Sequence, residues 1–131
     1  MIVVDTSAIM AVLLGEPERE TYLQLIAGYS SAHISAVSVH EAGMVMRARR
    51  GEAEVADLYD LLQSLKIDIE AFDATQARLA ISAFGRFGKG IHPKARLNLG
   101  DCAAYALAIH LGLPLLFKGD DFSATDVAVA K

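Results

Sequence analysis

Short apolar runs alternate with longer segments whose apolar residues recur at helical spacing along most of the chain. The run Ile2-Val3-Val4 is too short for a helix and predicts a buried strand that ends at Asp5. The segment 52–65 carries leucines at helical spacing and predicts an amphipathic helix. Strands that alternate with helices are typical of an α/β fold, in which helices cover both faces of a parallel sheet.

The boundaries of the expected elements follow from turn and capping residues. Thr6 and Ser7 offer an N-cap for the first helix, Gly15 ends that helix, and Asp73 caps a later one. A long loop is expected over 85–99, where glycines and a proline interrupt the helical pattern. The expected strands are 2–5, 32–35, 67–71 and 115–117, and the expected helices are 8–14, a segment from Pro17, a segment from Ser35 or Ser38 to about Arg50, 52–65, 74–87 and 101–111.

Acidic residues occur where this fold gathers ligands. Asp5 follows the first strand, Asp120 and Asp121 follow the last one, and Glu41 and Asp101 lie near the beginnings of helices. Ligands of parallel sheets bind beyond the carboxyl ends of the strands, so these acids can converge on one edge. Like charges at short range raise one another's pKa, and a divalent cation removes that cost. Carboxylate oxygens suit Mg²⁺ or Mn²⁺, which also bind phosphate, so the pattern indicates a metal-dependent enzyme that acts on phosphate esters.

Length and composition narrow the class of protein. A chain of 131 residues is expected to form a single domain over 1–131. Although 53% of the residues are hydrophobic, the longest apolar stretches, 8–14 and 102–109, fall far short of the roughly 20 residues that cross a bilayer. The start lacks the basic region of a signal peptide, so a cytoplasmic protein without a membrane segment is expected. The single cysteine, Cys102, lies in an apolar helical pattern and is interpreted as a core residue.

Two further features predict partners. The apolar excess is large for a small monomer and predicts a surface that binds a second copy or another protein. The net charge is −4, yet the segment 74–100 contains no acidic residue and five basic ones. Such a segment beside an acidic cluster predicts a track for phosphate groups, formed by Arg86, Lys89, Lys94 and Arg96.

Four motifs occur in order along the chain. They are Val3-Val4-Asp5-Thr6-Ser7-Ala8, Ser38-Val39-His40-Glu41, the run from Gly88 through Asn98-Leu99-Gly100-Asp101 to Cys102, and the run from Phe117 through Gly119-Asp120-Asp121 to Asp126. In this order and at these separations they closely resemble the PIN-domain ribonucleases of the VapC toxin type. The resemblance implies a PIN-like three-layer sandwich with a central parallel sheet of four to five strands, and cleavage of RNA with Mg²⁺ or Mn²⁺. It also implies a VapB-like antitoxin that masks the site, and a homodimer is expected.

The family pattern assigns the acids one by one. By match, Asp5, Glu41 and Asp101 take the positions of the first three family acids. Many members carry the fourth acid where this chain has Gly119, so the chain departs from that form. It resembles instead a Lys-Gly-Asn-Asp-Phe variant, which favours Asp121 over Asp120 as the fourth carboxylate.

The expected roles follow from phosphodiester hydrolysis, which needs an activated water and stabilised charge on the phosphoryl oxygens. One or two Mg²⁺ ions can supply both. Asp5 and Asp101 are expected to be direct ligands, and Glu41 a ligand or the residue that orients a bound water. Asp121 is expected to be a second-site or outer-shell ligand. Thr6, Ser7 and Asn98 are supporting residues.

Other classes fit less well. A haloacid-dehalogenase-type phosphatase also has an acid after its first strand, but it needs a second one where this chain has Ser7. A response-regulator receiver needs an acidic pair beside the first strand and an acid after a central strand, which 67–70 does not provide. A PIN-like binding module without activity is the remaining alternative, and the intact acids argue against it.

Overall fold

Six helices and four strands alternate along the chain in the computed structural model, which describes all residues 1–131. Each element matches a segment expected from the hydrophobic pattern. The elements are β1 (Ile2–Val4), α1 (Thr6–Leu13), α2 (Arg19–Gly28), β2 (Ala32–Ser35), α3 (Ala36–Arg50), α4 (Ala53–Ser64), β3 (Ile67–Glu70), α5 (Ala74–Phe87), α6 (Leu99–Leu111) and β4 (Leu115–Leu116).

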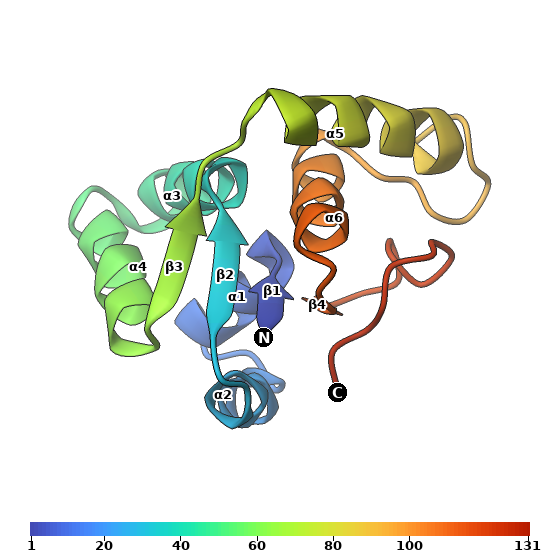
Figure 1. Ribbon diagram of the computed structural model, residues 1–131. Coiled ribbons are helices and arrows are strands. Elements are labelled where there is room, and N and C mark those ends of the chain that lie inside the picture. The colour runs from blue at the N-terminus through green and yellow to red at the C-terminus, as the bar shows by residue number, and fades with distance from the viewer.

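The strands form one parallel sheet in the order β3-β2-β1-β4 (Figure 1). The chain builds outward from β1 to β3 and then crosses back to place β4 on the other side of β1. Every strand therefore ends at the same edge of the sheet. The segments that follow β1 and β4 become neighbours there, because Val4 pairs with Leu116. This topology confirms the predicted α/β class, with four strands.

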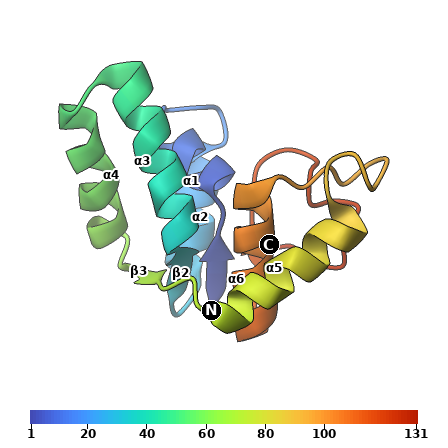
Figure 2. The same ribbon diagram turned by 90° about the horizontal axis from the view of Figure 1, so that it is seen from above.

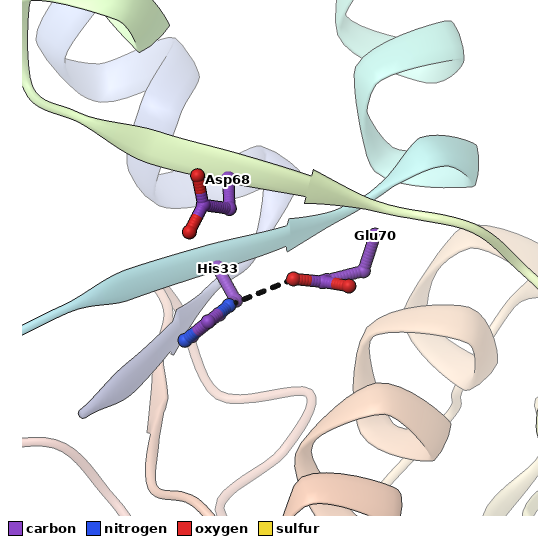
Figure 3. A group of neighbouring side chains, drawn as sticks. All are labelled: His33, Asp68 and Glu70. Carbon is purple, nitrogen blue, oxygen red and sulfur yellow. Dashed lines mark hydrogen bonds and ion pairs between the residues drawn. The ribbon is translucent and has the colours of Figure 1, made fainter.

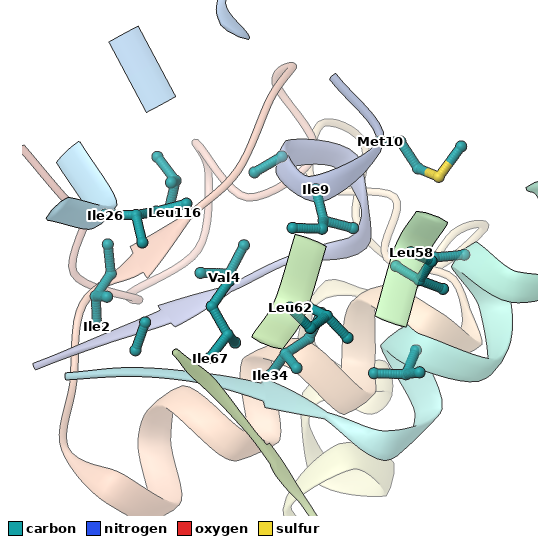
Figure 4. Packing of buried hydrophobic residues seen from close by; sticks show 14 of the residues in the cluster. Ile2, Val4, Ile9, Met10, Ile26, Ile34, Leu58, Leu62, Ile67 and Leu116 are labelled. Carbon is teal, nitrogen blue, oxygen red and sulfur yellow. The ribbon is translucent and has the colours of Figure 1, made fainter. Parts of the chain in front are cut away.

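Two hydrophobic cores lie on opposite faces of the sheet. Ile2, Val4 and Ile34 point into the core that α1 to α4 cover (Figure 4). Val3 points the other way, into a second core covered by α5 and α6. The alternation follows from the two-residue period of a strand. Figure 2 shows the resulting three layers, with α5 and α6 across the sheet from the other helices.

Several boundaries differ from those expected. The N-cap of α1 is Asp5 and not Thr6 or Ser7, because the Asp5 side chain accepts the backbone N–H of Ser7. Helix α6 begins at Leu99 after the cap Asn98, so Asp101 lies within its first turn. Helix α2 begins at Arg19, two residues after Pro17, because the chain forms turns over 17–18 first. Helix α5 ends at Phe87 as predicted, and the loop before α6 spans 88–98 instead of 85–99.

The remaining caps are as expected. Ser35, one of two candidates, caps α3 by accepting from the backbone N–H of Val37. Asp73 caps α5 in the same way through Gln76. Cys102 is buried in the second core, where burial raises the pKa of its thiol to about 11, as suits an inert core residue. Each helix of the fold falls short of the length and apolar character that a bilayer crossing demands.

Candidate functional site

Asp5 is fixed at the end of the central strand. Its Oδ2 atom accepts the backbone N–H of Ser7 at 3.0 Å and the Ser7 hydroxyl at 2.6 Å. The same hydroxyl accepts the backbone N–H of Lys118 at 2.9 Å, just after β4. Ser7 thus links the carboxylate that follows β1 to the segment that follows β4, which agrees with the supporting role expected of it.

The other oxygen of Asp5 is available for a ligand. Asp5 is only 2% exposed, and its Oδ1 atom is buried without any hydrogen-bond partner. Burial raises the pKa of this carboxyl to about 6 against the opposing effect of the Ser7 hydrogen bonds, and the charge of Glu41 raises it further. A buried, unpartnered carboxylate oxygen beside a second carboxylate is the arrangement that a cation stabilises.

Glu41 lies in α3 and faces the start of α6. Its carboxylate occupies the space where a side chain at Gly100 would be, with both oxygens 2.6 Å from the position of an added Cβ. Thr6 supports the same arrangement, because its hydroxyl donates to the carbonyl of Ser38 at 3.4 Å and joins the beginnings of α1 and α3. The beginnings of three helices therefore meet around Asp5 and Glu41.

Asp101 completes the group from the first turn of α6. Asn98 and Asp101 form a reciprocal capping box, in which each side chain accepts the other's backbone N–H, at 2.8 and 3.0 Å. This role explains why Asn98 supports the site. Burial raises the pKa of Asp101 to about 7, and the charges of Asp5, Asp121 and Glu41 contribute to the rise. The charges of the other three acids that the sequence singled out thus all act on Asp101.

The segment after β4 presents the two neighbouring acids differently. Both Asp120 and Asp121 are exposed and line a cleft of about 650 Å³. Only Asp121, of these two, contributes to the raised pKa of Asp101. This difference supports Asp121 as the fourth member of the cluster.

The predicted basic residues separate into two groups. Lys94 and Arg96 line the same cleft as Asp121, so cations and carboxylates face one groove. Arg86 lies elsewhere: its guanidinium pairs with Asp126 at 3.2 Å and stacks over the Phe87 ring at 4.6 Å. Lys89 is exposed at the start of the loop and is not part of the cleft lining. The structure therefore brings two of the four predicted cations to the cleft that Asp120 and Asp121 line.

The donor set fits a divalent metal ion. Asp5, Glu41 and Asp101 supply only oxygen ligands, which suit hard cations. The unpartnered Oδ1 of Asp5 and the raised pKa values of Asp5 and Asp101 show uncompensated negative charge. Asp101 uses one oxygen in the capping box, and its other oxygen is free for a ligand.

Sequence reasoning missed two residues that shape the site. Gly100 is required because any side chain at this position would collide with the Glu41 carboxylate. The sequence signal that could have identified it is its position directly before Asp101. The backbone N–H of Lys118 donates to the Ser7 hydroxyl, and no sequence signal marks a main-chain donor of this kind. The side chain of Lys118 also pairs with Glu16 at 2.6 Å and with Glu18 at 3.3 Å, which anchors the start of the Asp121 segment to the α1–α2 connection.

Known proteins resemble this chain over nearly its whole length. The PIN domain family model matches residues 2–128. The chain is 43% identical over 129 residues to ribonuclease VapC42 of Mycobacterium tuberculosis, with 98% of each chain covered. It is 40% identical over 125 residues to ribonuclease VapC28 of the same species, covering 95% of this chain and 94% of that protein.

A solved structure shares the fold. The crystal structure of M. tuberculosis VapC20, described as a toxin that cleaves the sarcin-ricin loop, superposes with a TM-score of 0.79 at 21% identity and covers 98% of this chain and 97% of its own. The chain belongs to the PIN domain family and, within it, to the VapC-type ribonucleases, the toxins of VapBC toxin-antitoxin systems. The resemblance inferred from the four motifs is confirmed.

Proposed function

We propose that this protein cleaves RNA internally with Mg²⁺ or Mn²⁺ held by Asp5, Glu41 and Asp101. One observation carries the proposal: burial and the charges of Asp5, Asp121 and Glu41 together raise the pKa of Asp101 to about 7. The effect of these three charges on Asp101 supports a cluster of four carboxylates at one edge of the sheet. When bound, the divalent ion supplies positive charge for the phosphoryl oxygens and activates water for attack.

The protein's own groups orient the reaction. Ser7 holds Oδ2 of Asp5, so Oδ1 faces the ligand position. The capping box fixes Asp101 on the rigid start of α6. Asp121 is the outer member of the cluster. Lys94 and Arg96, which line the same cleft, bind the phosphates that flank the cut. Attack by water leaves a 5′-phosphate and a 3′-hydroxyl on the products.

The partners follow from exposed surfaces and from the family. An apolar groove of about 500 Å³ lies between α5 and α6, lined entirely by hydrophobic residues, and Ile81 and Leu99 on it are 74% and 81% exposed. Apolar surface of this kind suits a second copy of the chain, so we propose a homodimer. We also propose that a VapB-like antitoxin binds over the cleft. A chain with the same fold, at a TM-score of 0.74, occurs in a toxin-antitoxin complex from Klebsiella pneumoniae. Because the proposed substrate is RNA, we expect the protein in the cytoplasm.

A cleavage assay tests the metal assignment. Activity on structured RNA should disappear with EDTA and return on addition of Mg²⁺ or Mn²⁺. Asp5→Asn and Asp101→Asn should each abolish cleavage while circular dichroism shows a folded protein, because asparagine still accepts hydrogen bonds at both caps. Retained cleavage in either variant would contradict the assignment. The 5′ ends of the products, sequenced after ligation, identify the cut sites.

A further inference from the structure

A second group of metal-ligand side chains lies on β2 and the edge strand β3. His33, Asp68 and Glu70 each offer one ligand atom, and these atoms all lie within 4.8 Å of one another (Figure 3). The strand register explains the group, because His33 pairs directly with Asp68. Glu70, two residues further along β3, points to the same face. Rigid backbone of two paired strands therefore positions the three donors.

Both ring nitrogens of His33 already have defined partners. Nδ1 lies 2.9 Å from Oε1 of Glu70, and Nε2 lies 3.2 Å from the Ser31 hydroxyl. The imidazole is largely buried, with 13% of its side chain exposed. Two ligands at the tetrahedral angle around an ion with bonds of roughly 2.0–2.2 Å are about 3.3–3.6 Å apart. The Nδ1–Oε1 separation of 2.9 Å is that of a hydrogen bond, and a small movement of the Glu70 side chain lets an ion replace the proton between these two atoms.

The charges of this group are incompletely compensated. Asp68 and Glu70 project from the same face of one strand, and Glu70 pairs only with the neutral or protonated imidazole of His33. The side chain of Asp68 is exposed and takes part in no hydrogen bond or ion pair. Two carboxylates with one shared histidine leave net negative charge, which a divalent ion neutralises.

We propose that His33, Asp68 and Glu70 bind a first-row transition metal ion such as Zn²⁺, separate from the catalytic acids. One nitrogen and two oxygen donors suit Zn²⁺ or Mn²⁺, whereas Mg²⁺ strongly prefers oxygen and water. The ring binds the ion at Nδ1 as the neutral tautomer with its hydrogen on Nε2: a protonated ring releases its Nδ1 proton to solvent, and a neutral ring with its hydrogen on Nδ1 transfers that hydrogen to Nε2 through solvent. Nε2 then keeps its hydrogen and donates it to Ser31, an outer-shell contact of the kind that orients metal-bound histidines. Water fills the remaining coordination positions.

The ion would act as a clamp on the edge of the sheet. It joins β2 to β3, whose outer side has no neighbouring strand. Glu70 pairs in register with Ser35, and Ser35 caps α3, the helix that carries Glu41. An ion that links β2 to β3 at this position would restrict the movement of the beginning of α3, the helix that contributes Glu41 to the proposed catalytic site.

Zinc binding to a variant without the catalytic acids tests the proposal. In an Asp5→Asn, Asp101→Asn background the other acidic site cannot compete. Isothermal titration with Zn²⁺ at pH 7.5 should show one site, and Zn²⁺ should raise the midpoint of thermal unfolding by several degrees, while the same concentration of Mg²⁺ should not. His33→Gln and Glu70→Gln should abolish this binding. Ser31→Ala should weaken it by about 10-fold through loss of the outer-shell contact.

A matched control separates the cluster from a single surface histidine. His110→Gln removes an exposed histidine in the last turn of α6 and should leave Zn²⁺ binding unchanged. Absence of Zn²⁺ binding in the background variant, or binding that survives both His33→Gln and Glu70→Gln, would overturn the proposal. Either result leaves the RNA cleavage assay unaffected, since that assay reports the Asp5 cluster. Circular dichroism of each variant in EDTA shows whether the metal-free fold is intact.

Discussion

The carboxylate of Glu41 lies against the α-carbon of Gly100, so close that a methyl group there would be 2.6 Å from both oxygens. No other arrangement of the site depends so directly on the absence of a side chain. The atoms in conflict are the end of a flexible side chain rather than backbone, so Glu41 can move aside at low energetic cost. A side chain at position 100 should therefore change the position of the Glu41 carboxylate more than it changes the stability of the fold.

Gly100→Ala should lower RNA cleavage while the protein stays folded. Alanine favours a helix over glycine by roughly 1 kcal/mol, so the midpoint of thermal unfolding should stay unchanged or rise, even as Glu41 is displaced from Asp101. Gly43→Ala is the matched control, because Gly43 lies in the same helix as Glu41 and an added methyl there meets only a Leu58 methyl at 3.9 Å. Equal cleavage by the two variants would show that the position of Glu41 does not matter.

The metal-free protein should lose stability as the pH rises from about 4 to about 7. Asp5 and Asp101 have pKa values of about 6 and about 7 when folded, against an ordinary value of 3.8. Over this range the folded state holds more protons than the unfolded state, so stability falls with pH. For the buried Asp5 the rise in pKa corresponds to about 3 kcal/mol. Urea unfolding in EDTA at about pH 4 and about pH 8 measures the effect.

Asp5→Asn isolates the contribution of one carboxyl. At about pH 3.5, below the ordinary pKa of 3.8, Asp5 is largely protonated in both the folded and the unfolded state, so the variant and the wild type should have similar stability there. At pH 8 the variant should be more stable in EDTA, because it has no buried charge and still caps α1. A wild type whose metal-free stability is independent of pH would contradict the burial of an uncompensated charge at this position.

The sequence predicted the order and type of every element, because strands and helices differ in hydrophobic period and each helix carries a recognisable boundary signal. It also predicted that Asp5 and Asp121 each follow a strand of one parallel sheet, and the topology confirms this placement. It did not predict that Arg86 pairs with Asp126. That ion pair depends on how the C-terminal segment folds back over α5, a relationship with no local signal in the chain.

Charge reversal should distinguish the two groups of basic residues. Lys94→Glu together with Arg96→Glu should weaken RNA binding for all sequences. The slope of log Kd against the logarithm of the salt concentration should decrease by about one for each phosphate that the variant no longer binds. Arg78→Glu changes the same kind of charge on an exposed position of α5 outside the cleft, and should have a smaller effect. Fluorescence anisotropy at several salt concentrations, with a catalytically inactive Asp101→Asn protein, gives both slopes. Identical slopes for the cleft and control variants would remove Lys94 and Arg96 from the RNA path.

His92 should control the shape of the loop that carries Lys94 and Arg96. Its Nδ1 atom accepts the backbone N–H groups of Lys94 at 3.1 Å and Ala95 at 2.9 Å. The Oδ1 atom of asparagine can accept from the same groups, as in an Asx-turn. His92→Asn should therefore keep RNA affinity, whereas His92→Ala should weaken it and destabilise the protein by about 1–2 kcal/mol. Fluorescence anisotropy measures the RNA affinity of the two variants, and urea unfolding measures their stability. Equal RNA affinity and equal stability of the two variants would show that an acceptor atom at position 92 does not determine the shape of the loop.

The two acids after β4 should differ in importance. The charge of Asp121 contributes to the raised pKa of Asp101, whereas Asp120 has no such effect, although both line the cleft. Asp121→Asn should lower cleavage by about 10-fold to 100-fold, as expected for an outer-shell partner of the metal, and Asp120→Asn should be nearly silent. Because both residues are exposed, neither change should alter the fold, and circular dichroism verifies this.

Cleavage rate against Mg²⁺ concentration then separates weaker metal binding, which excess Mg²⁺ corrects, from a slower reaction at saturation. An inactive Asp120→Asn beside an active Asp121→Asn would reverse the assignment, and two active variants would mean that Asp5, Glu41 and Asp101 suffice.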